Sequence, residues 1–288
     1  MFKRVLVPVD GSELSEAVFP WITYFAATLQ PEPRFRIVRA FEPPSLVYLL
    51  PDLSVPTTHI LSDEHLSGAI LGYLEQIKSR LRLQVDTKML IGDPASEILE
   101  MSESSDLVIM SSHGRGGIGK WLLGSVATKV ARGVRVPLLV ISAKVPKPAK
   151  NLSIKSILCA DDGSAVSERA FEVAARLAKA LGAKLHIYCG VSQVELSDTL
   201  ALRTNQEGIK RASRRLAKLA ESAPDGVEVT YEARETYGQT GISRYAEELG
   251  VDLICMGSHG KGGFERWMLG SETEKTLLGA KCPVLITH

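Results

Sequence analysis

The sequence predicts an α/β fold with two domains, each a five-stranded parallel sheet covered by helices on both faces. The first observation is an internal repeat: residues 5–12 (VLVPVDGS) return as 157–164 (ILCADDGS), and 107–114 (LVIMSSHG) return as 253–260 (LICMGSHG). The second is that short apolar runs alternate with amphipathic stretches in each half. Strands that are buried on both faces and alternate with helices are typical of parallel sheets.

The second half shows this alternation most clearly. Ser164 is a suitable N-cap, the apolar residues of 170–181 recur at helical spacing, and Gly182 is a suitable stop. The remaining elements follow in order. Strands are expected at 155–161, 183–189, 227–233, 251–256 and 283–287, and further helices around 206–222, at 240–249 and after the glycine loop.

The last apolar run of each half, 137–141 and 283–287, has an edge that would otherwise be exposed. We therefore expect these two strands to pair across a pseudo-two-fold axis, which makes the chain an internal pseudo-dimer. The domains are expected at 1–145 and 153–288. The Pro- and Lys-rich stretch 146–152 is expected to be a short, stiff linker.

Segment 42–68 has no counterpart of similar composition in the second half. Its prolines argue against a continuous helix. Three interpretations stay open: a flap over the first site, a surface that binds a partner, or a segment that packs on its own domain.

The composition excludes several classes of protein. The 288 residues include 34 Lys and Arg against 33 Asp and Glu, a net charge of +1, which argues against a nucleic-acid partner. No apolar run approaches the roughly 18 residues of a membrane span. The four cysteines are far apart and lack metal-binding spacing, so we expect no disulfide framework, no metal site and a cytoplasmic location.

The loop 114–120 (GRGGIGK) matches two phosphate-binding patterns imperfectly. A dinucleotide fingerprint belongs after the first strand and needs an acid about 20 residues later, whereas this loop follows the fourth strand and lacks that acid. A Walker loop needs a hydroxyl where Trp121 stands, and Glu265-Arg266 replaces Gly119-Lys120 in the repeat. Both interpretations are therefore poor.

Both halves instead keep one spacing after the fourth strand. The second half has Gly257-x-x-Gly260, nine residues, then Gly270-Ser271; the first half has Ser in place of the first glycine and ends in Gly124-Ser125. Glycines let a ligand approach backbone N–H groups, and a helix that opens at Gly-Ser favours phosphate. Four cations add positive charge to these loops: Arg115, Lys120, Lys261 and Arg266.

This spacing, together with VPVDGS at the first strand, resembles the universal stress proteins in their tandem form. The resemblance covers nearly the whole chain. It implies Rossmann-like domains of the adenine nucleotide α-hydrolase type that bind ATP, AMP or ADP, with or without Mg²⁺. The first site would comprise Pro8, Val9, Asp10, Ala40, Met110, Ser111, Gly114, Arg115, Gly124, Ser125 and Val126. The second would comprise Asp161, Asp162, Met256, Gly257, Gly260, Lys261, Gly270 and Ser271.

Three positions depart from the family pattern. Ser111 replaces a glycine, Ala160 replaces a proline, and Glu272 stands where the first half has Val126. A carboxylate at 272 would repel phosphate. We therefore expect at least one occupied site, without an assignment to either half.

The resemblance implies a stress-response or signalling role, without catalytic residues, that acts through a protein partner of unknown identity. A homodimer is left open. Two rivals remain: a slow ATPase that uses the same pocket, and a scaffold that binds no nucleotide and acts by protein pairing.

Simpler structural roles compete at several positions. Residues 271–274 (SETE) form a capping-box pattern, and Ser125 is a potential helix cap. Asp10 and Asp162 suit the turns that start helices. The paired histidines His113 and His259 are expected to stabilise the loops, and the tryptophans Trp121 and Trp267 to pack in the core.

Overall fold

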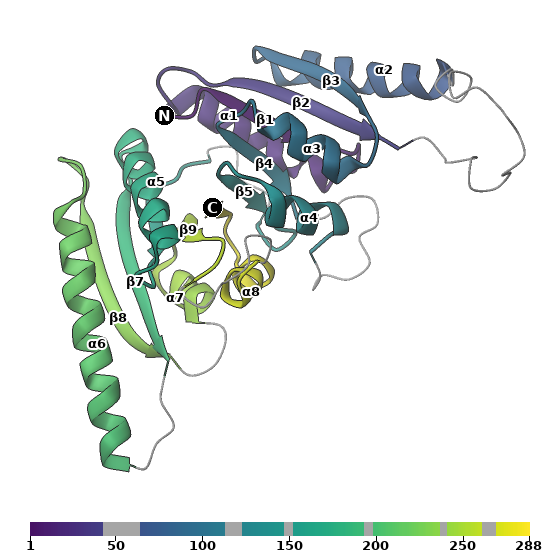
Figure 1. Ribbon diagram of the computed structural model, residues 1–288. Helices are drawn as coiled ribbons and strands as arrows, with labels where there is room; N and C mark the ends of the chain where they lie inside the picture. Colours follow the sequence, from purple (N-terminus) through teal and green to yellow (C-terminus); the bar gives the residue numbers. More distant parts are fainter. Residues whose placement is uncertain (43–63, 113–122, 147–151, 193–197, 237–240, 261–268) are drawn as a thin grey trace, which may run out of the picture.

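The computed structural model describes residues 1–42, 64–112, 123–146, 152–192, 198–236, 241–260 and 269–288 (Figure 1). The strands are β1 (Arg4–Pro8), β2 (Arg34–Phe41), β3 (Val85–Ile91), β4 (Leu107–Ser111), β5 (Leu138–Ile141), β6 (Ser156–Ala160), β7 (Lys184–Ser192), β8 (Val229–Thr236), β9 (Leu253–Gly257) and β10 (Val284–Thr287). A 3₁₀ helix, η1 (Ser15–Val18), precedes the α-helices α1 (Phe19–Thr28), α2 (Glu64–Leu81), α3 (Pro94–Ser102), α4 (Ser125–Gly133), α5 (Ala165–Leu181), α6 (Asp198–Glu221), α7 (Gly241–Leu249) and α8 (Ser271–Gly279).

The strands form one sheet in the order β3-β2-β1-β4-β5-β10-β9-β6-β7-β8. All neighbours within a half are parallel, whereas β5 and β10 are antiparallel, with Leu139 opposite Leu285. The second half therefore runs through the same strand order in reverse. This confirms the predicted five-stranded parallel sheets and the pairing of the two final strands.

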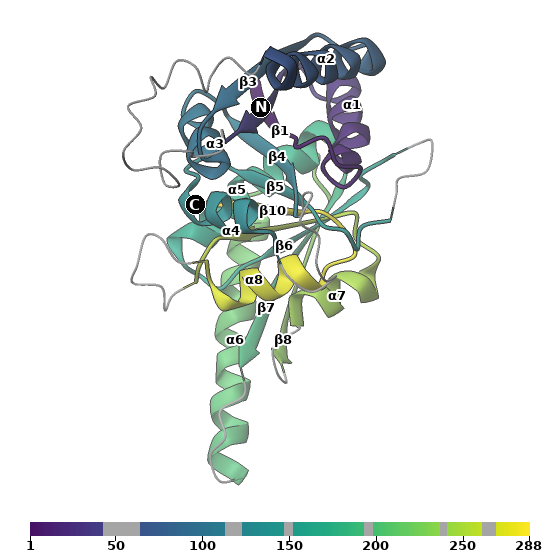
Figure 2. The same ribbon diagram turned by 90° about the vertical axis from the view of Figure 1, so that its right-hand side faces the viewer.

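Successive side chains along each strand point to opposite faces of the sheet, so they pack into two hydrophobic cores, one on each face. In β1, Val5 and Val7 point to the face that α1, α2, α5 and α6 cover, whereas Leu6 points to the face that α3, α4, α7 and α8 cover. In both views α4 and α8 lie beside each other on this second face (Figures 1 and 2). The cores are continuous across the β5–β10 junction, which holds the halves together.

Helix α5 begins and ends at the residues that the sequence predicts. The Ser164 side chain accepts a hydrogen bond from the Ser167 N–H group, and Gly182 ends the helix with a φ of +64°. Helix α6, expected around 206–222, begins earlier, at Asp198. Residues 64–68 of the unmatched segment belong to α2, and its residues 43–63 lie outside the described part of the chain.

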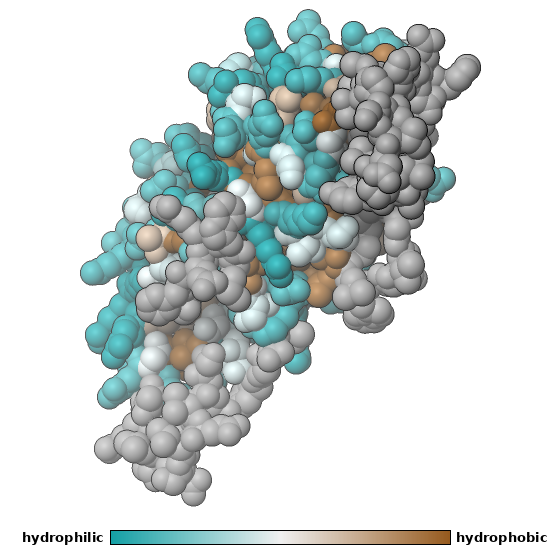
Figure 3. Space-filling model, turned by 45° about the vertical axis from the view of Figure 1, so that its right-hand side comes forward, coloured by the Kyte–Doolittle hydropathy of each residue, from teal (hydrophilic) through white to brown (hydrophobic). Residues whose placement is uncertain are grey.

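The face in Figure 3 is largely hydrophilic where residues are described, with small, separated apolar patches. Among the described helices, none is both long enough and apolar enough to cross a bilayer.

Candidate functional site

Each half contains a topological switch point at the carboxyl ends of its strands. In the first half β1 lies between β2 and β4. The chain therefore turns toward β2 after it leaves β1, and toward β5, on the other side, after it leaves β4. The same holds for β6 and β9 in the second half. Ligands of open α/β sheets bind in the crevice at such points. The predicted site residues at the ends of these four strands therefore lie where the fold favours a ligand.

A pair of matched hydrogen bonds closes the base of each glycine loop. The Gly124 N–H group donates to the Ser112 carbonyl oxygen at 2.8 Å, and the Gly270 N–H group donates to the Ser258 carbonyl oxygen at 2.7 Å. The two serines are themselves held by the neighbouring final strands, β5 and β10. The start of α4 or α8 is thereby fixed beside the end of the fourth strand of its half.

The N-terminus of α4 and that of α8 have no side-chain cap. Gly124 and Gly270 are the N-cap residues, and Ser125 and Ser271 are the first helical residues and are exposed. The capping-box interpretation of 271–274 and the capping role of Ser125 are therefore wrong. Within the described part of the chain no side chain caps the N–H groups of either first turn, and together with the helix dipole these groups favour an anion.

Gly270 is required for close approach rather than for an unusual backbone angle, since its φ is −64°. A Cβ atom there would lie 3.1 Å from Cα of His259 and 3.3 Å from the Ser258 oxygen. Any side chain at this position would push the loop away from the helix start.

The presence of Ser111, where the family pattern has a glycine, has a structural explanation. Its counterpart Gly257 must be small because a Cβ atom there would lie 2.9 Å from the side chain of Val166, at the start of α5. The residue that corresponds to Val166 in the first half is Leu14, which is 39% exposed and precedes the 3₁₀ helix. The altered helix start leaves room for the serine.

Asp10 and Asp162 both organise the turn after the first strand of their half. Asp10 Oδ1 accepts hydrogen bonds from the Ser12 N–H group and hydroxyl, and Asp162 Oδ1 accepts one from the Ser164 N–H group. The other oxygen of Asp162 lies so close to Gly260 that a Cβ atom on this residue would clash with it. The turn role is thus confirmed, and Asp162 also contacts the glycine loop of its half.

The two halves differ at the residue before these aspartates. Val9 stands in the first half, whereas the second half has Asp161, whose side chain is fully buried and accepts from Arg215 Nε at 2.7 Å, from the Ser167 hydroxyl and from the Gly163 N–H group. Burial alone would lower the pKa of Arg215, but the hydrogen bond and charge of Asp161 raise it. Arg215 therefore stays charged at neutral pH.

The guanidinium of Arg215 lies over the turn of the second half. Its atoms would lie 2.9 Å from a Cβ atom on Gly163. Arg215 comes from α6, one turn after the buried Ala212. Arg215 was not among the residues predicted from the sequence, because a helix with several arginines gives no sign of which one turns inward.

A different polar group lies near the turn of the first half. The Tyr73 hydroxyl donates to Glu16 Oε1 at 3.0 Å, and the Arg39 guanidinium lies 5.0 Å from the centre of the Tyr73 ring. Burial and the nearby carboxylates of Glu16 and Asp10 raise the pKa of Tyr73. This group was not predicted from the sequence, because β2 contains three arginines, Arg34, Arg36 and Arg39, and nothing local marks the last of them as the one near the turn.

The other predicted residues fall into three groups. Met110 and Met256 are buried in the core beneath the site, so only their backbones are available to a ligand. Pro8 ends β1, while Ala40 and Val126 are half-buried. Outside the described residues lie Gly114, Arg115, Lys120, Lys261 and Arg266, as well as His113, Trp121 and Trp267.

His259 contacts its own loop, with Nδ1 3.0 Å from the Ser258 hydroxyl. It also faces His288, whose Nε2 atom is buried without a hydrogen-bond partner among the described residues. Burial, with the charges of His259 and Arg169, lowers the pKa of His288 to about 4.

This gives a prediction for stability against pH. The unfolded chain binds a proton at position 288 below a pKa of about 6.5, whereas the folded chain resists it until about 4. We expect the free energy of unfolding to fall by about 2 kcal/mol between these pH values and His288→Gln to flatten that decline. Urea unfolding at half-unit pH steps measures it, and identical slopes for both proteins would contradict it.

The comparisons with known proteins bear on the fold and the family of the chain. The model of the universal stress protein family matches residues 1–142 and again residues 153–288. Universal stress protein Rv2005c of Mycobacterium tuberculosis is 29% identical over 296 residues, which cover 99% of this chain and 96% of that protein. Universal stress protein MJ0531 of Methanocaldococcus jannaschii is 34% identical over 143 residues, which cover 46% of this chain and 81% of that protein.

Among solved structures, a universal stress protein from Archaeoglobus fulgidus has the same fold, with a TM-score of 0.67 at 23% identity. The match covers 99% of this chain and 95% of the other. Two consecutive family matches on one ten-stranded sheet leave a single conclusion. The chain belongs to the universal stress protein family, in its tandem form.

Proposed function

We propose that the chain binds an adenine nucleotide at the switch point, with its phosphates at the N-terminus of α4 or α8. The observation that carries this proposal is the uncapped helix start, held beside the end of the fourth strand by the same hydrogen bond in both halves. A phosphate there would accept from the N–H groups of the first turn and would benefit from the helix dipole. The resemblance of the sequence implies ATP, AMP or ADP as the nucleotide.

We assign the main site to the first half. In the second half, Arg215 and the buried Asp161 fill the turn where the resemblance places the nucleoside, and Glu272 adds a carboxylate to the helix start. The first half has Val9 in place of Asp161 and Val126 in place of Glu272. A nucleotide in the second half would have to displace an ion pair, and this costs binding energy.

The proposed role is cytoplasmic stress signalling, in which nucleotide binding changes how the chain meets a protein partner. Rapid hydrolysis would need a group that positions the attacking water, and the described residues around α4 offer no Glu or Gln there. We therefore expect ATP turnover to be slow at most, with Mg²⁺ optional for binding. The division into domains 1–145 and 153–288, with linker 146–152, is part of the same proposal.

A substitution at Glu272 tests nucleotide binding at the second half. Its carboxylate is 52% exposed and 3.1 Å from Lys275 Nζ, so solvent and the ion pair screen its charge. We expect Glu272→Gln to tighten ATP binding at the second half by less than about fivefold, in a protein whose first half is disabled. Weaker binding in an equilibrium titration would instead make Glu272 a ligand of metal or water and favour the ATPase.

Two measurements test the proposed function as a whole. Mass spectrometry of small molecules released from freshly purified protein should find an adenine nucleotide. Calorimetric titration of the emptied protein with ATP should then give about one tight site per chain. Protein that is purified empty and stays unresponsive to ATP would overturn the proposal and favour the scaffold.

A further inference from the structure

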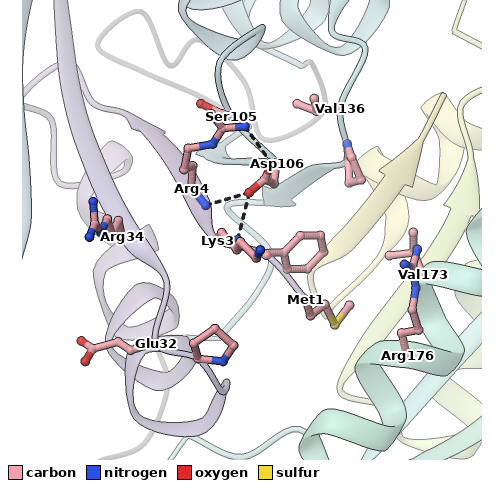
Figure 4. A pocket seen from close by; sticks show the side chains of 13 residues that line it. Met1, Lys3, Arg4, Glu32, Arg34, Ser105, Asp106, Val136, Val173 and Arg176 are labelled. Atoms are coloured by element: carbon pink, nitrogen blue, oxygen red, sulfur yellow. Dashed lines mark hydrogen bonds and ion pairs between the residues drawn. The ribbon is translucent and has the colours of Figure 1, made fainter.

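A cavity lies at the amino ends of the strands, opposite the carboxyl ends where the nucleotide site is proposed. Its volume is about 930 Å³, and it opens between the amino end of β1 and helix α5 of the other half. Figure 4 shows Met1, Lys3 and Arg4 on one wall and Val173 and Arg176 on the opposite wall. The size falls in the range of small-molecule sites.

The repeat supplies a comparison for this cavity within the same molecule. Counted from the glycine of the DGS turn, Val173 corresponds to Trp21 and Arg176 corresponds to Tyr24. Trp21 is 3% exposed, and the Tyr24 hydroxyl accepts a hydrogen bond from the Ile154 N–H group at 3.1 Å. Ile154 is the counterpart of Phe2, which lines the cavity. Two aromatic side chains of α1, Trp21 and Tyr24, thus fill the equivalent place in the other half. At the cavity, α5 has the smaller Val173 and the more flexible Arg176 instead.

The charges on the lining are unbalanced. Four cationic side chains face two acidic ones, Glu32 and Asp106. Asp106 is already satisfied, since it accepts from the Lys3 and Arg4 N–H groups at 3.0 and 2.9 Å and from the Arg4 guanidinium. These hydrogen bonds outweigh burial and lower the pKa of Asp106. The cavity therefore has a positive field at neutral pH.

Three of the cations that line the cavity have no ion-pair partner among the described residues. Lys3, Arg34 and Arg176 form no ion pair with any described residue. Among the described residues, the Arg176 side chain donates a hydrogen bond from Nε to the Glu172 carbonyl oxygen of its own helix, at 3.3 Å. Guanidinium groups match the geometry of carboxylate and phosphate oxygens. Between these cations, the cavity is lined by apolar side chains, Phe2, Val136, Pro137 and Val173 among them.

We propose that this cavity binds an amphiphilic anion, an apolar body that carries a carboxylate or phosphate group. The apolar body packs against Phe2 and Val173, and the oxyanion meets Arg176, on the same wall as Val173. The site is independent of the proposed nucleotide site, which lies at the other ends of the strands. It exists in one half only, because Trp21 and Tyr24 take its place in the other.

Laurate, dodecyl phosphate and dodecyltrimethylammonium, titrated by calorimetry well below their micellar concentrations, test the proposal. We expect both anions to bind once per chain and the cation to bind at least tenfold more weakly. Val173→Trp, which copies the other half, should weaken laurate binding at least tenfold. Arg176→Glu should do the same by reversing a charge.

Lys179→Glu is the matched control, because it reverses an exposed charge on the same helix outside the cavity. It should keep laurate affinity within about twofold, and all three variants should bind ATP as the parent does. Equal laurate binding by the parent, Val173→Trp and Arg176→Glu would overturn the proposal. So would absence of laurate binding to the parent, or equal affinity for the cationic amphiphile. Because Arg176 is exposed, its variant tests the site even if Val173→Trp disturbs the fold.

Discussion

Ser125→Asp is expected to weaken ATP binding at least about thirtyfold while it stabilises the folded protein. Ser125 is the exposed first residue of α4 and makes no capping hydrogen bond. A carboxylate there would face the phosphate at the helix start, and repulsion of about 2 kcal/mol corresponds to that loss of affinity. The same carboxylate favours the helix dipole, so the free energy of unfolding should rise by about 0.5 kcal/mol. Calorimetry with ATP and urea unfolding measure the two effects.

Two control variants separate this effect from general damage. Ser125→Ala should change ATP affinity less than about threefold, because it keeps the N–H groups of the first turn, which are proposed to hold the phosphate. Ser271→Asp places the same charge on α8 and should leave the tight site intact, because that site belongs to the first half. If Ser271→Asp removes the binding and Ser125→Asp keeps it, the assignment to the first half is wrong. If both variants bind ATP as the parent does, the phosphate does not lie at either helix.

The framework of the fold could be predicted from the sequence because its signals are local or repeated. The limits of α5 follow from one hydroxyl at Ser164 and one left-handed glycine, Gly182. The pairing of 137–141 with 283–287 follows from the duplication, since two copies of an unpaired edge strand satisfy each other. The start of α6 was predicted late, because residues 198–205 include two threonines and an asparagine, which have modest helix propensity.

The capping box failed for a reason that lies outside the helix. The pattern at 271–274 suits a cap, but a hydrogen bond from the Gly270 N–H group to Ser258 starts the helix one residue earlier. Ser271 is then helical and cannot act as the cap. The partner residue is twelve positions away across the glycine loop, so a local pattern could not reveal it.

The difference between the halves was visible in the sequence only as single substitutions. Asp161 in place of Val9 is one such change, and its meaning depends on Arg215, which is 54 residues away. Val173 in place of Trp21 is another, and its effect depends on contact with the opposite half. Both consequences arise from packing between elements that the sequence does not place side by side.

Arg215→Leu is expected to lower the free energy of unfolding by about 3 kcal/mol. The change leaves the Asp161 carboxylate, which is fully buried, without its cation, and an unpaired buried charge costs 3–5 kcal/mol. The lower end applies because Ser167 and Gly163 still donate hydrogen bonds to Asp161. Urea unfolding measures the loss, and Arg214→Leu, an exposed neighbour on α6, should change stability by less than about 0.5 kcal/mol.

Asp161→Val in the Arg215→Leu background copies Val9 of the first half and should restore stability to within about 1 kcal/mol of the parent. The Ser167 hydroxyl keeps a partner in this protein, since it also donates to the Ser164 carbonyl oxygen. If the double variant is no more stable than Arg215→Leu alone, the charge pair is not the cause of the loss. The double variant also removes the Arg215 guanidinium that covers the turn at Gly163. ATP stoichiometry should therefore rise from about one toward two per chain, because the second half then offers a helix start without an ion pair in the way.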